Sequence, residues 1–140
     1  MPATIADALH ALLTGDAILA GMLAKYGGQP AVFTARPIPA DAVMPYAIVE
    51  GPASDVAVRT LGNAEVGRRI DRDISIFAAA TGSSKALQLV AERVRTVLHG
   101  ASVSVDGFTR GRVTASGPVQ LSADEDTYGR LVSAHLRLIR

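Results

Sequence analysis

The chain has 140 residues, of which 49% are hydrophobic and 19% charged, and its formal net charge is +1. This length fits one domain of common size, and the composition is that of a soluble globular fold rather than a disordered or fibrous chain. The balance of fourteen Lys and Arg against thirteen Asp and Glu, with no basic cluster in the sequence, argues against a nucleic-acid binder. Cysteine is absent, which excludes disulfides, thiolate catalysis and Cys-ligated zinc but leaves the redox compartment undetermined.

The N-terminal segment has no features of a targeting sequence. Residues 1–13 lack the basic start and continuous apolar run of a signal peptide. No stretch approaches the roughly 18 uninterrupted apolar residues that a membrane span requires. We therefore expect an unprocessed soluble chain that forms a single domain over residues 1–140.

Two amphipathic helices are predicted next. Thr4 and Asp7 have the spacing of a capping box, and the apolar stripe that follows them stops at Gly15. A second apolar set begins after Asp16 and is closed by Gly27-Gly28, a helix C-cap signal. These patterns predict a short helical hairpin or a kinked helix pair.

After the helices the apolar period changes to that of strands. Residues 31–35 and 47–50 are short strand candidates, and Gly51-Pro52 is expected to end the second. Residues 53–69 are mixed and interrupted by glycines, which indicates a long connection. A loop of this length inside a compact domain is usually functional or disordered.

The clearest strand and helix follow this connection. Residues 70–79 alternate, with Ile70, Ile74 and Ile76 on one face and Asp71 and Asp73 on the other. The segment 81–84 is then expected to cap a long helix that ends at Gly100. The helix has apolar residues at helical spacing, Leu87, Val90, Val94, Val97 and Leu98.

The last third of the chain has the pattern of β structure. Asp106-Gly107 predicts a hairpin turn between strands at 103–105 and 108–113, and 118–121 is a further short strand. Residues 122–127 form an acidic turn before a final alternating strand at 132–138. Helices followed by strands in this order predict an α+β domain, with helices packed on one face of a mainly antiparallel sheet.

The polar residues offer few catalytic patterns. There is no G-x-S-x-G, and no two of His10, His99 and His135 have metal-ligand spacing. We interpret His99 as a cation at a helix C-terminus and the other two as surface residues. Asp71 and Asp73 share a strand face that could hold a metal, but nearby arginines favour a solvated face or an ion-pair ladder.

Two further segments have simple structural interpretations. The acids at 124–126 lack the alternate spacing and the glycine of a calcium loop, so turn chemistry accounts for them. The segment 82–85 opens a helix after a strand but lacks the glycines and the Gly-Lys pair of a phosphate loop. We expect a helix N-cap there, and we expect no metal, no cofactor and no enzymatic role.

The order of these elements resembles a known family. The N-terminal helix pair, the Pro-Tyr opening of the strand at 45–49, the strand 71–78 and the helix 84–98 together resemble the tail completion or tail terminator proteins of long-tailed phages and gene transfer agents. The resemblance covers nearly the whole chain and rests on apolar spacing rather than on catalytic signatures.

The resemblance implies a structural subunit of a virion tail. Members of this family are expected to form a hexameric ring at the head-proximal end of the tail tube, which stops tube growth and joins the tube to the head-tail connector protein. The implied partners are further copies of the chain, the major tail tube protein and the connector. No membrane and no sequence-specific nucleic acid is implied, although DNA can pass through such a ring.

The connection at 53–69 is the candidate contact arm. Its apolar residues alternate and have no obvious place in the core, so the candidate interface residues are Val56, Val58, Arg59 and Leu61. A hairpin extension that packs on its own sheet explains the same residues equally well. Two other functions stay open, another connector or minor tail subunit and a small-molecule-binding α+β domain.

Overall fold

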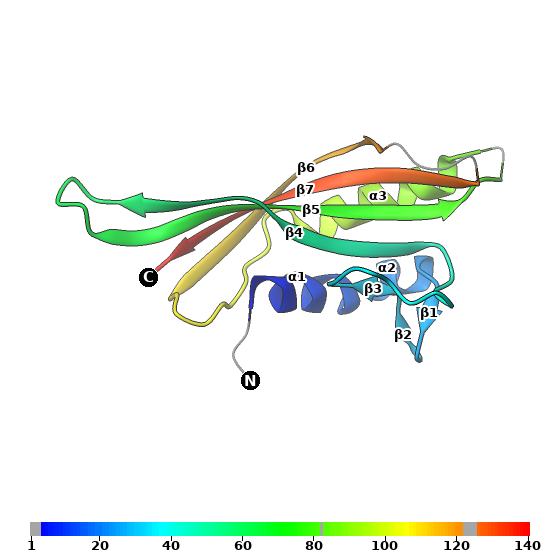
Figure 1. The fold of residues 1–140 in the computed structure, drawn as a ribbon, viewed down its shortest axis with the longest axis horizontal. Coiled ribbons are helices and arrows are strands. Elements are labelled where there is room, and N and C mark those ends of the chain that lie inside the picture. The colour runs from blue at the N-terminus through cyan, green and yellow to red at the C-terminus, as the bar shows by residue number, and fades with distance from the viewer. Residues whose placement is uncertain (1–3, 82, 122–125) are drawn as a thin grey trace.

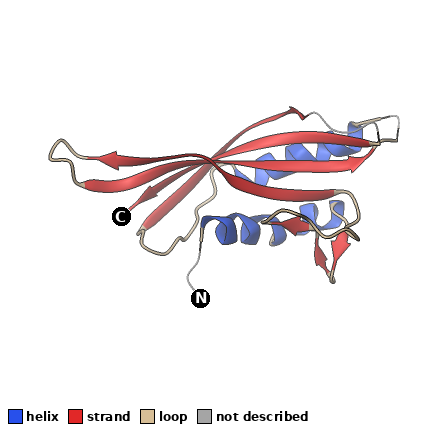
Figure 2. Cartoon of the chain, viewed as in Figure 1, coloured by secondary structure: helices blue, strands red, loops and turns tan. Residues whose placement is uncertain are grey.

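The computed structural model of the protein describes residues 4–81, 83–121 and 126–140. In these residues, helices pack along one face of a five-stranded sheet, and a small hairpin lies beside them (Figure 1, Figure 2). The predicted α+β class is confirmed. The elements are α1 (Ile5–Thr14), α2 (Ala17–Met22), β1 (Lys25–Tyr26), β2 (Gln29–Pro30), β3 (Val32–Phe33), β4 (Tyr46–Arg59), β5 (Glu65–Ala79), α3 (Lys85–Leu98), β6 (Arg110–Leu121) and β7 (Thr127–Ile139).

The strand order in the large sheet is β3-β4-β5-β7-β6. β3 is parallel to β4, and every other neighbouring pair is antiparallel. The long strands β4, β5 and β7 therefore lie at the centre, and the face against the helices holds the core. None of the helices in the described ranges is long and apolar enough to cross a membrane.

Both N-terminal helices begin as predicted, and α1 ends at Gly15 as predicted, but α2 ends earlier. Thr4 and Asp7 form a capping box, in which each side chain accepts from the other residue's N–H at 3.1 Å. α2 stops at Met22, and the expected continuation to Tyr26 is wrong. Gly27 and Gly28 have φ values of 60° and 81°, so they form the turn between β1 and β2 rather than a helix cap.

The long helix α3 supplies much of the core. Its apolar face packs on the sheet, and Val94 and Leu98 are fully buried. Ser84 occupies the N-cap position as predicted, but its side chain makes no cap hydrogen bond. Its hydroxyl accepts instead from Arg130 on β7 at 3.0 Å, which ties the start of α3 to the sheet.

The expectation that a strand ends at Gly51-Pro52 is wrong. β4 continues to Arg59, and the register with β5 shifts on either side of Pro52. Such bulges accommodate a proline, which cannot donate to a regular ladder. The predicted long connection at 53–69 is consequently a β-hairpin, formed by the end of β4 and the beginning of β5.

The C-terminal strands differ from the prediction mainly in their extent. The turn at Asp106-Gly107 is present, but before β6 only an isolated bridge pairs Ser102 with Arg112. The separate strand predicted at 118–121 is the end of β6, after a register shift. Of the predicted acidic turn, residues 122–125 lie outside the described residues.

The two faces of the sheet carry the predicted division of residues. The face toward the helices buries residues of β5 and β7, namely Ile70, Ile74, Ile76, Val132, Ala134, Leu136 and Leu138. The alternate residues of β5, β6 and β7 lie on the opposite side of the sheet and are exposed or half-buried. They run from Arg69 to Asp73, from Arg112 to Ser116 and from Ser133 to Arg137. We call this side the open face.

Candidate interaction surface

The hairpin at 53–69, called the arm below, projects beyond the helices (Figure 1). Val56 and Leu61 have relative exposures of 52% and 110%, whereas Val58 is half-buried. Arg59 donates to the carbonyl of Asn63 at 3.1 Å across the tip. The candidate residues therefore lie on an ordered projection of the sheet.

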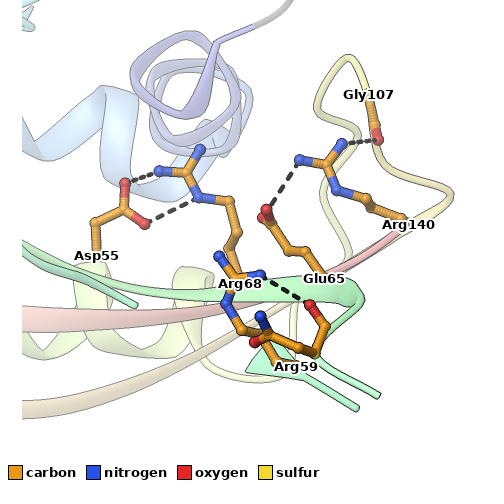
Figure 3. Close-up of polar contacts among 7 residues, drawn as sticks. Asp55, Arg59, Glu65, Arg68, Gly107 and Arg140 are labelled. Carbon is orange, nitrogen blue, oxygen red and sulfur yellow. Dashed lines mark hydrogen bonds and ion pairs between the residues drawn. The ribbon is translucent and has the colours of Figure 1, made fainter. Parts of the chain in front are cut away.

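Ion pairs join the two strands of the arm to each other and to the C-terminal residue (Figure 3). Arg68 makes a two-pronged ion pair with Asp55 across the hairpin. Arg140 pairs with Glu65 at 3.3 Å, and its backbone N–H donates to Val66 at 3.0 Å. The arm is thereby fastened to the last residue of the chain.

Gly67 permits close packing where the arm joins the sheet. It lies opposite Val58 on β4 and Ile139 on β7. A Cβ atom at this position would overlap the backbone carbonyl of Leu138. Because a carbonyl in a strand ladder cannot rotate away, only glycine allows this approach of β5 to β7.

The open face carries a chain of hydrogen bonds across four strands. Ser116 Oγ lies 3.0 Å from His135 Nε2, and His135 Nδ1 lies 2.6 Å from Asp71 Oδ1. The other carboxylate oxygen of Asp71 accepts from Ser54 at 2.7 Å. The hydrogen bonds from Ser54 and His135, together with the charge of Arg69, lower the pKa of Asp71.

Ser116, His135 and Asp71 have the order of a serine, histidine and acid relay. In hydrolases, the serine of such a relay sits on a strained turn beside oxyanion donors. Here Ser116 lies within the edge strand β6, and the side chains of His135 and Asp71 are 44% and 45% exposed. We interpret the relay as a polar ladder between strands.

Asp73 belongs to the same ladder. Its carboxylate accepts from Ser133 at 3.0 Å. Arg68, one of the arginines near Asp73 in the sequence, pairs with Asp55 instead. Within the described ranges, no group of three or more His, Asp or Glu side chains could hold a metal ion.

A cluster of arginines lies beside this ladder. Arg112, Arg137 and Arg69 are directly opposite one another on β6, β7 and β5. We call these three residues the arginine row. They line a shallow groove of about 650 Å³ together with Asp71 and His135. The expectation that the chain has no basic cluster is wrong, because strand pairing joins residues that are distant in the sequence.

The other singled-out polar residues have local roles. His99 caps the end of α3, and its Nδ1 accepts from the N–H of Ala115 at 3.1 Å. This contact joins the end of α3 to β6. His10 lies half-buried on α1. In the segment 82–85, Ser83 Oγ accepts from Lys85 N–H at 3.3 Å, and Gly82 lies outside the described residues.

Comparisons with known proteins give a consistent result. The family model for tail completion protein gp17 matches residues 7–138. A chain in the solved structure of the virion of a native gene transfer agent particle superposes with a TM-score of 0.75 at 21% identity, covering 98% of this chain and 96% of that one. A second solved structure gives a TM-score of 0.52 at 14% identity, with 79% of each chain covered. No curated protein matches.

Proposed function

Because the chain belongs to the tail completion protein gp17 family, we propose that it closes into a ring at the head-proximal end of a phage-like tail tube. The chain is a structural component of a virion tail. In the proposed role, the ring stops tube growth and joins the tube to the head connector. The ring is a hexamer, and its partners are the major tail tube protein and the connector protein.

The observation that carries this proposal is the arm. It exposes Val56 and Leu61 on a projection whose strands are joined by ion pairs to each other and to Arg140. A cyclic ring needs a contact in which different surfaces of neighbouring copies meet head to tail. A preordered projection suits such a contact, because little conformational freedom is lost when it docks.

The size of the effect follows from the exposed apolar side chains. Burying one Val or Leu side chain fully contributes up to about 1.5 to 3 kcal/mol. A ring repeats each contact around its circumference, so losing these side chains weakens every interface at once. The isolated chain loses little, because Val56 and Leu61 are already exposed in it.

The test replaces Val56, Val58 and Leu61 together by Ser in a strain that produces the particle. We expect the variant chain to fold, but the tails to have uncontrolled length or to remain separate from heads. Electron microscopy of the particles gives tail length and the fraction of joined heads. Thermal unfolding of the purified variant verifies that the fold is intact.

A matched control uses exposed apolar residues outside the arm. Ile18, Val43 and Leu89 have relative exposures of 56%, 59% and 48%, and their triple serine variant should give normal tails. Normal joined particles from the arm variant would contradict the proposal. If the arm variant unfolds, the arm belongs to the subunit's own core, and the interface assignment fails as well.

A further inference from the structure

The arginine row is an unusual arrangement for a sheet. Arg69, Arg112 and Arg137 are all exposed and directly opposite one another. Among the described residues, none of the three side chains makes a hydrogen bond or an ion pair, and Arg69 acts on Asp71 only through space. Like charges directly opposite each other destabilise a sheet.

Other arginines of the chain are neutralised by acids. Ion pairs join Arg36 to Glu50, Arg68 to Asp55, Arg93 to Asp16 and Arg140 to Glu65. The row therefore places three cations together on one face, and the nearby carboxylate of Asp71 is already hydrogen-bonded by Ser54 and His135. An anionic partner would relieve this repulsion.

We propose that the arginine row binds carboxylate groups on an acidic surface of another protein of the particle. This inference extends the proposed function and rests on it for the identity of the assembly. The guanidinium fork matches a carboxylate with two parallel hydrogen bonds. Thr114, which lines the same groove, adds a hydroxyl group beside the row.

The surroundings of the row favour a protein over a nucleic acid. Val56 lies opposite Arg69 and is 52% exposed, and Ile139 on the same face is 44% exposed. Protein interfaces combine arginine with apolar side chains, whereas DNA-binding faces are much more positively charged.

The spacing defines the partner further. Directly opposite residues in an antiparallel sheet have Cα atoms about 4.5 to 5.5 Å apart, so the row spans about 10 Å. Acids at alternate positions of an extended segment are about 6.8 Å apart. Such a segment, laid across the strands, places two carboxylates over the row, and the side chain between them points away from the sheet.

The test measures binding by the purified chain at low salt. The probes are a fluorescent peptide of alternating Glu and Val, and a fluorescent DNA duplex of random sequence. The row variant replaces Arg69, Arg112 and Arg137 by Gln. The control variant, K25Q/K85Q/R95Q, removes the same charge from β1 and α3. We expect the row variant to bind the peptide at least about tenfold more weakly than wild type, and the control less than about twofold.

A second measurement tests the repulsion itself. The melting temperature of the row variant should exceed that of wild type at low salt, and the difference should shrink as salt screens the charges. The control variant should show no such gain. A row variant that melts below wild type would contradict the repulsion on which this inference stands.

The remaining outcomes separate this inference from the proposed function. If the duplex binds through the row more tightly than the peptide, the site is for nucleic acid and the inference is overturned. If neither probe distinguishes the row variant from the control, the row is no binding site. Leu61→Ser leaves the arginine row intact. If this variant gives normal tails and still binds the peptide, the result contradicts the proposed arm contact but not the arginine row as a binding site.

Discussion

Gly67→Ala tests how the arm is attached to the sheet. The added methyl group would overlap the carbonyl of Leu138, so β5 and β7 must separate at the base of the arm. Overpacking of this kind costs about 1 to 3 kcal/mol, and a lost ladder hydrogen bond about 1 kcal/mol more. The reduced freedom of the unfolded chain offsets about 0.4 to 1 kcal/mol. We expect a net destabilisation of about 1 to 3.6 kcal/mol.

Urea unfolding of wild type and variant measures this difference directly. Gly51→Ala is the matched control, because it lies in β4 and an added Cβ there has no atom within 4 Å. The control should be neutral or slightly stabilising. If Gly67→Ala unfolds at the same urea concentration as wild type, β5 and β7 do not approach as closely as described, and the attachment of the arm is wrong.

Two further predictions test the core and its helices. Val94→Asp places an unpaired charge at a fully buried position of α3. The substitution should cost several kcal/mol of stability and unfold the domain. A soluble variant with a cooperative thermal transition would contradict the packing of α3. Arg93, and also the N–H of Leu19, hold the pKa of Asp16 below its ordinary value of 3.8. The free energy of unfolding that this lowered pKa adds is fully present above the ordinary pKa of 3.8. It is lost as the pH falls through the lower pKa of Asp16 in the folded chain. The unfolding free energy of Asp16→Asn should therefore vary less with pH below about 4, and urea titrations that stay parallel to wild type would contradict the Arg93 contact.

Local patterns predicted the parts of the fold that depend on local spacing. The capping box at Thr4, the helix α3 and the alternation of β7 all follow from periodicity within a dozen residues, and the structure has them in place. Gly51-Pro52 suggested the end of a strand, because glycine and proline usually interrupt regular pairing. Pairing with β5 carries β4 through this site by two register shifts, and nothing local to the residues indicates that.

The surface features were harder to predict because they depend on which strands are neighbours. Asp71 and His135 are 64 positions apart, and only the pairing of β5 with β7 brings them together. The arginine row arises in the same way. The available signal was the alternation of polar residues in each strand, which indicates an exposed face but not the register that aligns one strand with the next.

The position of the chain in the particle tests the proposed function most directly. Electron cryomicroscopy of intact particles, averaged at the joint between head and tail, would resolve a ring of subunits there. We predict one ring of six copies with a mass of about 87 kDa, six times the 14.5 kDa of the chain, and with each arm in contact with a neighbouring copy or the tube. Copies distributed along the tube, or found at the tip far from the head, would contradict the proposed function.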